Sequence, residues 1–165
     1  MTSCKSCSVR CFSWRSCRES MPNSMLRAAT RTYNTPHRAM IPAPSTAYAP
    51  ADPDPDQWIR VAKDAGMTYA VLTVKHHYGH ALWPSDVSDY DVTTSSNPTD
   101  VVKLFVKACR KHGLKPGFYY SIGWDKVNMS KRSPEEYAQF MHAQLKELLT
   151  RYGPITELWF DIPWD

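Results

Sequence analysis

Three apolar segments of the sequence end in side chains that can donate, accept or transfer a proton. His76 and His77 follow the first segment, Tyr119 lies near the end of the second, and Asp161 lies near the end of the third. Imidazole, phenol and carboxyl groups are frequent participants in acid–base chemistry and in the binding of polar ligands. These four residues are therefore candidates for a functional site, provided that the fold brings the segment ends together.

The three segments have the β-branched and aromatic composition of buried strands. They cover residues 68–75, 115–122 and 155–162, and each follows a predicted helix. This αβ-αβ-αβ order predicts an α/β fold of three consecutive helix–strand units, with parallel strands covered by helices. Both an open doubly wound sheet and a closed (β/α)8 barrel satisfy this order, and both collect function at the carboxyl ends of the strands. No glycine-rich phosphate loop follows a strand, which argues against nucleotide binding.

Each predicted helix has a start signal, an apolar stripe and a terminal glycine. The starts are Asp54-Pro55, Asn97-Pro98 and the capping box Ser133-Pro134-Glu135-Glu136. The stripes are Trp58, Val61, Ala62 and Ala65; Val101, Phe105, Ala108 and Cys109; and Tyr137, Met141, Leu145 and Leu148. The stops are Gly66, Gly113 and Gly153.

Side-chain alternation along a strand predicts which residues share a face of the sheet. The apolar residues of the three strands should face the helices: Ala70, Leu72 and Val74; Phe118, Tyr120 and Ile122; and Leu158, Phe160 and Ile162. Tyr119, Trp159 and Asp161 then face the opposite side, where His77 joins them. His76 reaches the same place only if its strand curls at the end.

Each candidate also has a simpler interpretation. Asp161 could cap a following helix, and adjacent histidines occur on many surfaces. A metal site would need a third ligand at a fixed spacing from His76 and His77. Trp83, Trp124 and Trp159 could be core residues, although aromatic rings at a barrel mouth also stack on sugars. The combination on successive strand ends, rather than any one residue, indicates a site.

Charge and composition divide the chain near residue 50. Residues 1–50 hold seven Lys or Arg and one acid, a net +6, whereas residues 51–165 hold thirteen and fifteen, a net −2. We therefore expect no nucleic-acid partner for the folded part. The sequence has no apolar run long enough to span a membrane, and no secretory signal peptide is visible. We interpret residues 1–50, with four cysteines and a proline-rich end, as a leader without regular structure, and 51–165 as the catalytic domain.

Five segments make the sequence similar to the retaining α-L-fucosidase family of glycoside hydrolases. They are Trp58–Gly66 (WIRVAKDAG), Tyr69–His77 (YAVLTVKHH), Leu82–Ser85 (LWPS), Gly113–Ser121 (GLKPGFYYS) and Leu158–Asp161 (LWFD). Together they run in order through the structured part of the chain, which makes the resemblance specific.

The resemblance implies a role for each candidate residue. Asp161 falls on the family's nucleophile, His76 and His77 fall on the pair that binds fucose hydroxyls, and Tyr119 lies at the sugar. Trp83 and Trp159 are expected to supply aromatic contacts to substrate. The implied reaction is double-displacement hydrolysis of terminal α-L-fucose from oligosaccharides or glycoconjugates, with no metal or cofactor. Relatives of this kind are secreted, periplasmic or lysosomal.

Two departures from the family pattern qualify this expectation. The family's usual His-His-Asp-Gly-Phe reads His76-His77-Tyr78-Gly79-His80 here, and the sequence ends four residues after Asp161. We therefore expect an incomplete (β/α)8 TIM barrel without its acid/base residue, and little or no activity of this chain alone. Two alternatives stay open: a non-catalytic carbohydrate-binding remnant of such a barrel, and a metal-dependent hydrolase using His76, His77 and Asp161.

Overall fold

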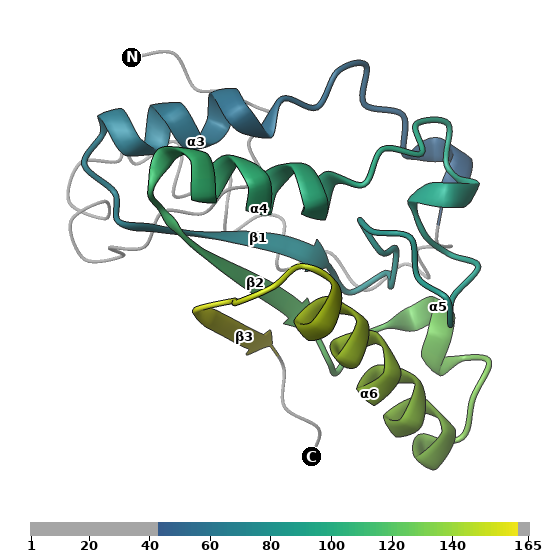
Figure 1. Ribbon diagram of the computed structural model, residues 1–165. Coiled ribbons are helices and arrows are strands. Elements are labelled where there is room, and N and C mark those ends of the chain that lie inside the picture. Colours follow the sequence, from purple (N-terminus) through teal and green to yellow (C-terminus); the bar gives the residue numbers. More distant parts are fainter. Residues whose placement is uncertain (1–42, 162–165) are drawn as a thin grey trace, which may run out of the picture. The chain divides into compact units, whose positions relative to one another are not determined.

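The computed structural model describes residues 43–161, which form a three-stranded parallel sheet with helices (Figure 1). The elements, in chain order, are η1 (Ser45–Ala47), α3 (Pro55–Asp64), β1 (Tyr69–Lys75), η2 (Val92–Thr94), α4 (Val101–His112), β2 (Lys115–Ser121), α5 (Lys126–Met129), α6 (Pro134–Arg151) and β3 (Glu157–Asp161). The strand order is β1-β2-β3, and both pairings are parallel. The predicted α/β class and parallel sheet are confirmed. Within the described residues, no helix has the length and apolarity needed to cross a membrane.

Two helix starts follow the predicted chemistry. Asp54 caps α3 by accepting a hydrogen bond from the backbone N–H of Gln57 at 3.0 Å. The capping box of α6 is complete, since Ser133 Oγ accepts from Glu136 N–H and the Glu136 carboxylate accepts from Ser133 N–H. Both helices have proline at the first turn, where its missing N–H leaves no intrahelical bond unmade.

The second helix starts later than predicted. α4 begins at Val101, and Asp100 is its cap, accepting from the backbone N–H of Lys103 at 2.8 Å. Asn97 instead holds a turn, because its side-chain oxygen accepts from Thr99 N–H and its side-chain N–H donates to the carbonyl of Pro50. An Asn-Pro pair can begin a helix or form a turn. Here Asp100 is the helix cap, and Asn97 forms the turn before it.

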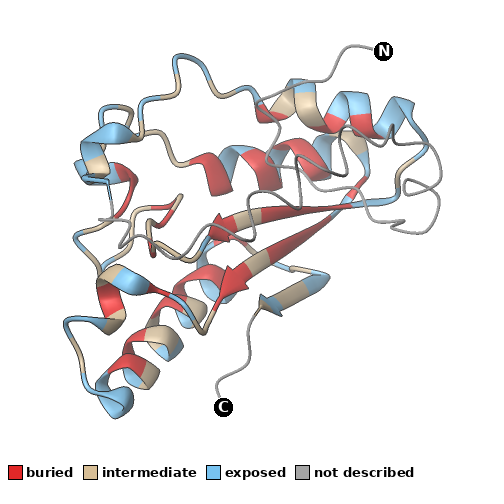
Figure 2. Cartoon of the chain, turned by 180° about the vertical axis from the view of Figure 1, so that it is seen from behind, coloured by how far each residue is buried: buried red, intermediate tan, exposed pale blue. Residues whose placement is uncertain are grey.

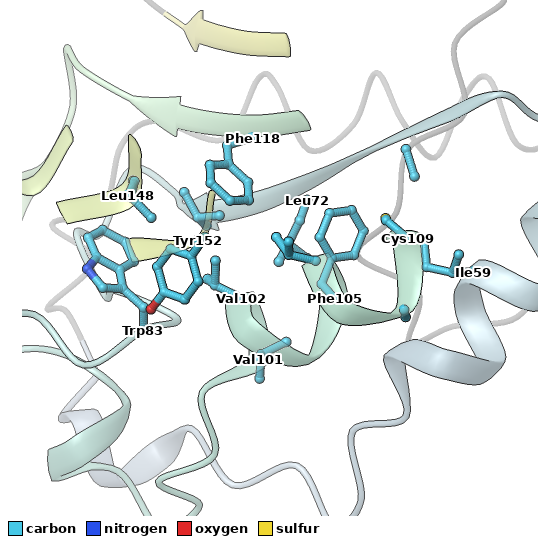
Figure 3. Packing of buried hydrophobic residues seen from close by; sticks show 14 of the residues in the cluster. Ile59, Leu72, Trp83, Val101, Val102, Phe105, Cys109, Phe118, Leu148 and Tyr152 are labelled. Atoms are coloured by element: carbon cyan, nitrogen blue, oxygen red, sulfur yellow. The ribbon is translucent and has the colours of Figure 1, made fainter. Parts of the chain in front are cut away.

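A single core fills the space between the helices and one face of the sheet (Figure 3). Its members include the predicted helix-facing residues of β1 and β2, which confirms their alternation: Ala70, Leu72, Val74, Phe118 and Tyr120. The predicted stripe of α4 is buried as well. The predicted stripe of α3 is correct in part: Ala62 is buried and Trp58 packs against the core, whereas Val61 and Ala65 are exposed. Ile59, which was not predicted, is buried instead.

β1 and β2 are largely buried, whereas β3 has no buried residue (Figure 2). Leu158 of β3 packs against the core, in agreement with its predicted face. Phe160 pairs in register with the fully buried Tyr120 but is 51% exposed. The same face of the sheet is therefore covered at β2 and open at β3.

The last residues of the predicted leader contact the loop after β1. Ser45 Oγ lies 3.0 Å from His80 Nε2, and the Tyr90 hydroxyl donates to the carbonyl of Ala43 at 2.7 Å. Ser45 Oγ also donates to the carbonyl of Asp91. Residues 43–50 are thus held against the sheet-bearing part of the chain, and the rest of the predicted leader, with its four cysteines, lies outside the described residues.

Gly117 allows the three strands to close together, which gives a first prediction. A Cβ added there would lie 2.8 Å from Glu157 Cβ, 3.1 Å from Val71 Cγ2 and 3.2 Å from the Glu157 carbonyl. Because these atoms belong to the neighbouring strands, Gly117→Ala should reduce the free energy of unfolding by roughly 1–3 kcal/mol. Urea denaturation followed by circular dichroism would measure this. A variant as stable as the wild type would show that the strands do not pack this closely.

Candidate active site

A β-bulge at the end of β1 decides where the two histidines lie. Thr73 pairs with Tyr119, but the next paired residue, Lys75, is opposite Tyr120, so the register shifts by one residue. Lys75 consequently points to the helix side with Tyr120, whereas simple alternation would place it on the opposite face with Thr73. The curl required to bring His76 to the site is therefore present.

His76 and His77 form an aromatic row with Tyr119. The ring of His76 stacks on that of Tyr119, with centroids 5.7 Å apart and 17° between the planes. The two imidazole centroids are 4.0 Å apart, and the ring of Trp124 lies 5.7 Å beyond His77. The structure thus brings together residues that the sequence places on two different strand ends.

Asp161 joins this group through β3. The register places Trp159 opposite Tyr119 and Asp161 opposite Ser121, so these four residues share the face away from the helices. The Tyr119 hydroxyl donates a hydrogen bond to Asp161 Oδ2 at 2.5 Å. The side chain of Asp161 is 45% exposed. A carboxylate that is both held by a phenol and open to solvent can meet an incoming ligand.

His77 contacts both neighbouring strands. Its Nδ1 lies 2.9 Å from Ser121 Oγ, and its Nε2 lies 3.9 Å from Asp161 Oδ2. Burial lowers the pKa of His77 below its usual value, the Asp161 carboxylate opposes that shift, and Lys126 adds to it. The imidazole is therefore neutral at pH 7, and its contact with Asp161 at that pH is polar rather than a salt bridge. Ser121 was not among the predicted site residues, although its position two residues after Tyr119 on one strand placed it on the same face.

The three tryptophans differ in exposure. Trp83 was expected to contact substrate but is completely buried, and its indole N–H donates to Glu147 Oε2 at 2.8 Å. Its ring lies in the core beside Leu148 and Tyr152 (Figure 3). With no exposed surface it cannot stack on a sugar in this structure, so that prediction is corrected. Trp159 is partly exposed on the site face, and Trp124 is exposed.

A cleft of about 380 Å³ lies beside β1, next to the histidines. Its walls include Ser45 and Tyr48 on one side and Thr73 and His76 on the other. Asp161 does not line this cleft, so the cleft borders the site rather than containing it. Among residues 43–161, no three His, Cys, Asp or Glu side chains are grouped closely enough to hold a metal ion. The metal-dependent alternative therefore lacks a ligand set in this part of the chain.

Known proteins are similar to this chain over most of its length. A family model described as α-L-fucosidase matches residues 5–165. α-L-Fucosidase 1 of Arabidopsis thaliana is 38% identical over 117 residues, which are 69% of this chain and 23% of that protein. The chain spans about a quarter of the length of the curated relatives it matches.

Solved structures are similar over the same region. A glycoside hydrolase 29 family member from an unknown rumen bacterium is 40% identical, with a TM-score of 0.66 over 73% of this chain and 22% of its own. An α-L-fucosidase of Bacteroides thetaiotaomicron, trapped as a covalent intermediate with 2-fluoro-fucosyl fluoride, is 32% identical, with a TM-score of 0.63 over 71% of this chain and 29% of its own.

The electrostatics of His77 give a second prediction. Replacing Asp161 by Asn removes the charge that favours the imidazolium, so the titration midpoint of His77 should move further down. Lys126→Gln removes an opposing positive charge and should move it up. Imidazole NMR signals followed against pH would measure both shifts. Because the unfolded chain binds a proton at higher pH than folded His77, the free energy of unfolding should fall as pH drops below about 6.5. Equal midpoints in the two variants would contradict the arrangement.

Proposed function

This chain belongs to the α-L-fucosidase family, and we propose that it carries the nucleophilic half of the active site of a retaining α-L-fucosidase. The observation that carries the proposal is the Tyr119–Asp161 hydrogen bond of 2.5 Å, on a carboxylate that remains 45% exposed. The neutral His77 at 3.9 Å completes a polar group around the same oxygen. The substrate in this proposal is a terminal fucose on an oligosaccharide or glycoconjugate.

The proposed architecture is part of a (β/α)8 barrel. Three consecutive helix–strand units in the order β1-β2-β3 fit one side of such a barrel, and the candidate residues gather at the carboxyl ends of the strands, where barrels have their active sites. On this proposal residues 51–165 form the partial catalytic domain and 1–50 the leader. The exposed Phe160 then lies where the next helix of a complete barrel would pack.

Asp161 is proposed to attack the anomeric carbon of fucose. Its carboxylate oxygen forms a bond to that carbon while the bond to the leaving oxygen breaks, and the leaving oxygen takes a proton from a second carboxyl group. Water then attacks the same carbon, the proton moves to that second group, and Asp161 leaves as a carboxylate. The Tyr119 hydroxyl donates a hydrogen bond to this carboxylate and so holds it in place at the strand end.

The structure limits which acidic residues could serve as the proton donor. Asp125 follows β2 but is completely buried against Lys75 Nζ at 2.7 Å, which leaves it unable to reach a substrate. Two further loop acids are paired with cations: Asp86 with Arg151, and Asp89 with Lys131 at 3.6 Å. The proton donor is therefore proposed to come from outside the described residues.

The two histidines and Trp159 are proposed to hold the sugar. His77 Nε2 lies 3.9 Å from Asp161, and the ring of His76 lies beside that of His77, so both imidazoles can hydrogen-bond sugar hydroxyls there. A neutral His77 can donate or accept. Trp159 shares the face of Asp161 and offers an aromatic surface for the apolar side of the sugar ring. These groups orient the anomeric carbon toward the carboxylate, and holding the reacting atoms in this way lowers the activation barrier of the reaction.

Covalent labelling tests the assignment of the nucleophile without the missing proton donor. Fluoride departs from 2-fluoro-fucosyl fluoride with less need of a proton than a sugar alcohol, so the chain should form a 2-fluorofucosyl ester on Asp161. Mass spectrometry of peptides would locate it. Asp161→Asn should abolish the adduct, whereas Asp86→Asn, an exposed acid, should leave it unchanged. An adduct on another residue, or binding of the sugar without an adduct, would contradict the proposal; the second result would favour a carbohydrate-binding remnant.

Turnover gives a complementary prediction for the complete enzyme that contains this sequence. Asp161→Gly should reduce hydrolysis of an aryl α-L-fucoside by several orders of magnitude while the fold persists, because little packing is lost at an exposed strand end. Azide should partly restore turnover, since a small anion can attack from the vacated position. If Asp161 were only a helix cap, stability would fall by roughly 0.5–2 kcal/mol and turnover would be nearly unchanged.

A further inference from the structure

A buried ion pair lies directly behind the two histidines. Lys75 Nζ donates to Asp125 Oδ2 at 2.7 Å and to the Tyr120 hydroxyl at 2.8 Å, and both charged side chains are 0% exposed. The Tyr137 hydroxyl donates to the same Asp125 oxygen at 3.3 Å. The free energy lost when two charges leave water is about as large as the free energy gained from their attraction. Net stabilisation of the fold is therefore a poor explanation for this buried ion pair. Its geometry suggests another role.

The ion pair fixes the direction of His76 through the bulge. Lys75 turns toward the helices because its ammonium group meets Asp125 there, and this rotation belongs to the register shift between Thr73 and Lys75. Successive side chains point to opposite faces, so His76 is left on the Tyr119 side, where it stacks. Without the shift, Lys75 would occupy the site face and His76 would point at the core.

Asp125 also holds the loop beyond His77. Its carboxylate accepts from the Asn128 side chain, which in turn donates to the carbonyl of Gly79 at 3.3 Å. The next residue, Lys126, donates its backbone N–H to the carbonyl of His77 at 3.0 Å. Gly79 has a φ of +86°, and a Cβ there would lie 1.9 Å from Asp125 Oδ1. The histidine pair is therefore held from both sides by one buried carboxylate.

We propose that Lys75 and Asp125 are positioning residues. Their ion pair selects the bulged register that places His76, and Asp125 holds the loop that places His77, so that both histidines are presented to the sugar. The presentation to a sugar rests on the proposed function, whereas the control of the histidine geometry does not. Neither residue touches the substrate, because both are sealed from solvent. An experiment must distinguish this positioning role from a role in stability alone.

The test uses three changes in the full 165-residue chain. Lys75→Met removes one charge and leaves Asp125 unpaired, so this variant should lose both stability and histidine geometry. Lys75→Met combined with Asp125→Asn leaves no orphan charge and keeps an amide oxygen as the α5 cap, so stability should largely return. Glu147→Gln is the matched control, since this second buried carboxylate bonds Trp83 but none of the histidine loop.

The deciding measurement is the imidazole NMR signature of His77, which reports its Nδ1 contact with Ser121 and its titration midpoint. We expect both to change in Lys75→Met and in the double variant, and to remain as in the wild type in Glu147→Gln. A double variant that regains the wild-type signature, or a Lys75→Met variant that keeps it, would overturn the positioning role. Stability is followed in parallel by urea denaturation, and a double variant that regains stability but not the signature supports the proposal.

Labelling of Asp161 by 2-fluoro-fucosyl fluoride separates this proposal from the function on which it rests. In the double variant the labelling rate should fall by on the order of 100-fold, because small displacements of positioning groups carry losses of that size. Absence of labelling in the wild-type chain would count against the fucosidase assignment alone, since the NMR signature still decides the role of Lys75 and Asp125. Unchanged labelling in the double variant would overturn their role at the site.

Discussion

Parallel strands in a fixed register impose the arrangement on which the whole site depends. Once Gly117 pairs with Glu157 and each later residue pairs in step, Tyr119 and Asp161 must share a face, and their side chains are close enough for a hydrogen bond. A shift of one residue would send Asp161 toward the helices and Phe160 toward the site. Within the described sheet, the register shifts at the bulge in β1, and this shift brings His76 to the site face.

Local chemistry made much of the fold predictable. The capping box at Ser133, the cap at Asp54 and the apolar alternation of β1 and β2 depend on neighbouring residues, so they could be inferred from sequence. The bulge could not, because it depends on a lysine meeting an aspartate 50 residues away. Trp83 was misassigned for a similar reason, because its ring packs in the core and its indole N–H meets Glu147, on a helix 64 residues later.

The site itself was predictable to the extent that alternation decides it. Tyr119 was placed on the correct face, and Ser121 could have been added by the same argument. His77 follows the register shift and the end of β1, so alternation along the strand does not account for its position. The protonation of His77 was not accessible, because it depends on burial and on the opposing charges of Asp161 and Lys126. The proposed roles of these residues toward a sugar rest on the face that they share rather than on any single motif.

The spacing of the site contacts has a consequence during synthesis. His77 meets Ser121 across 44 residues, and Tyr119 meets Asp161 across 42, so each contact joins neighbouring helix–strand units. At translation rates of about 5–20 residues per second, each strand leaves the ribosome roughly 2–9 s after the strand on which it docks. Helix formation and loop closure are far faster than this. The histidine pair and its partners on β2 can thus meet on a nascent chain before Asp161 has been made, so that the contacts of the candidate site form in order from the amino-terminal side.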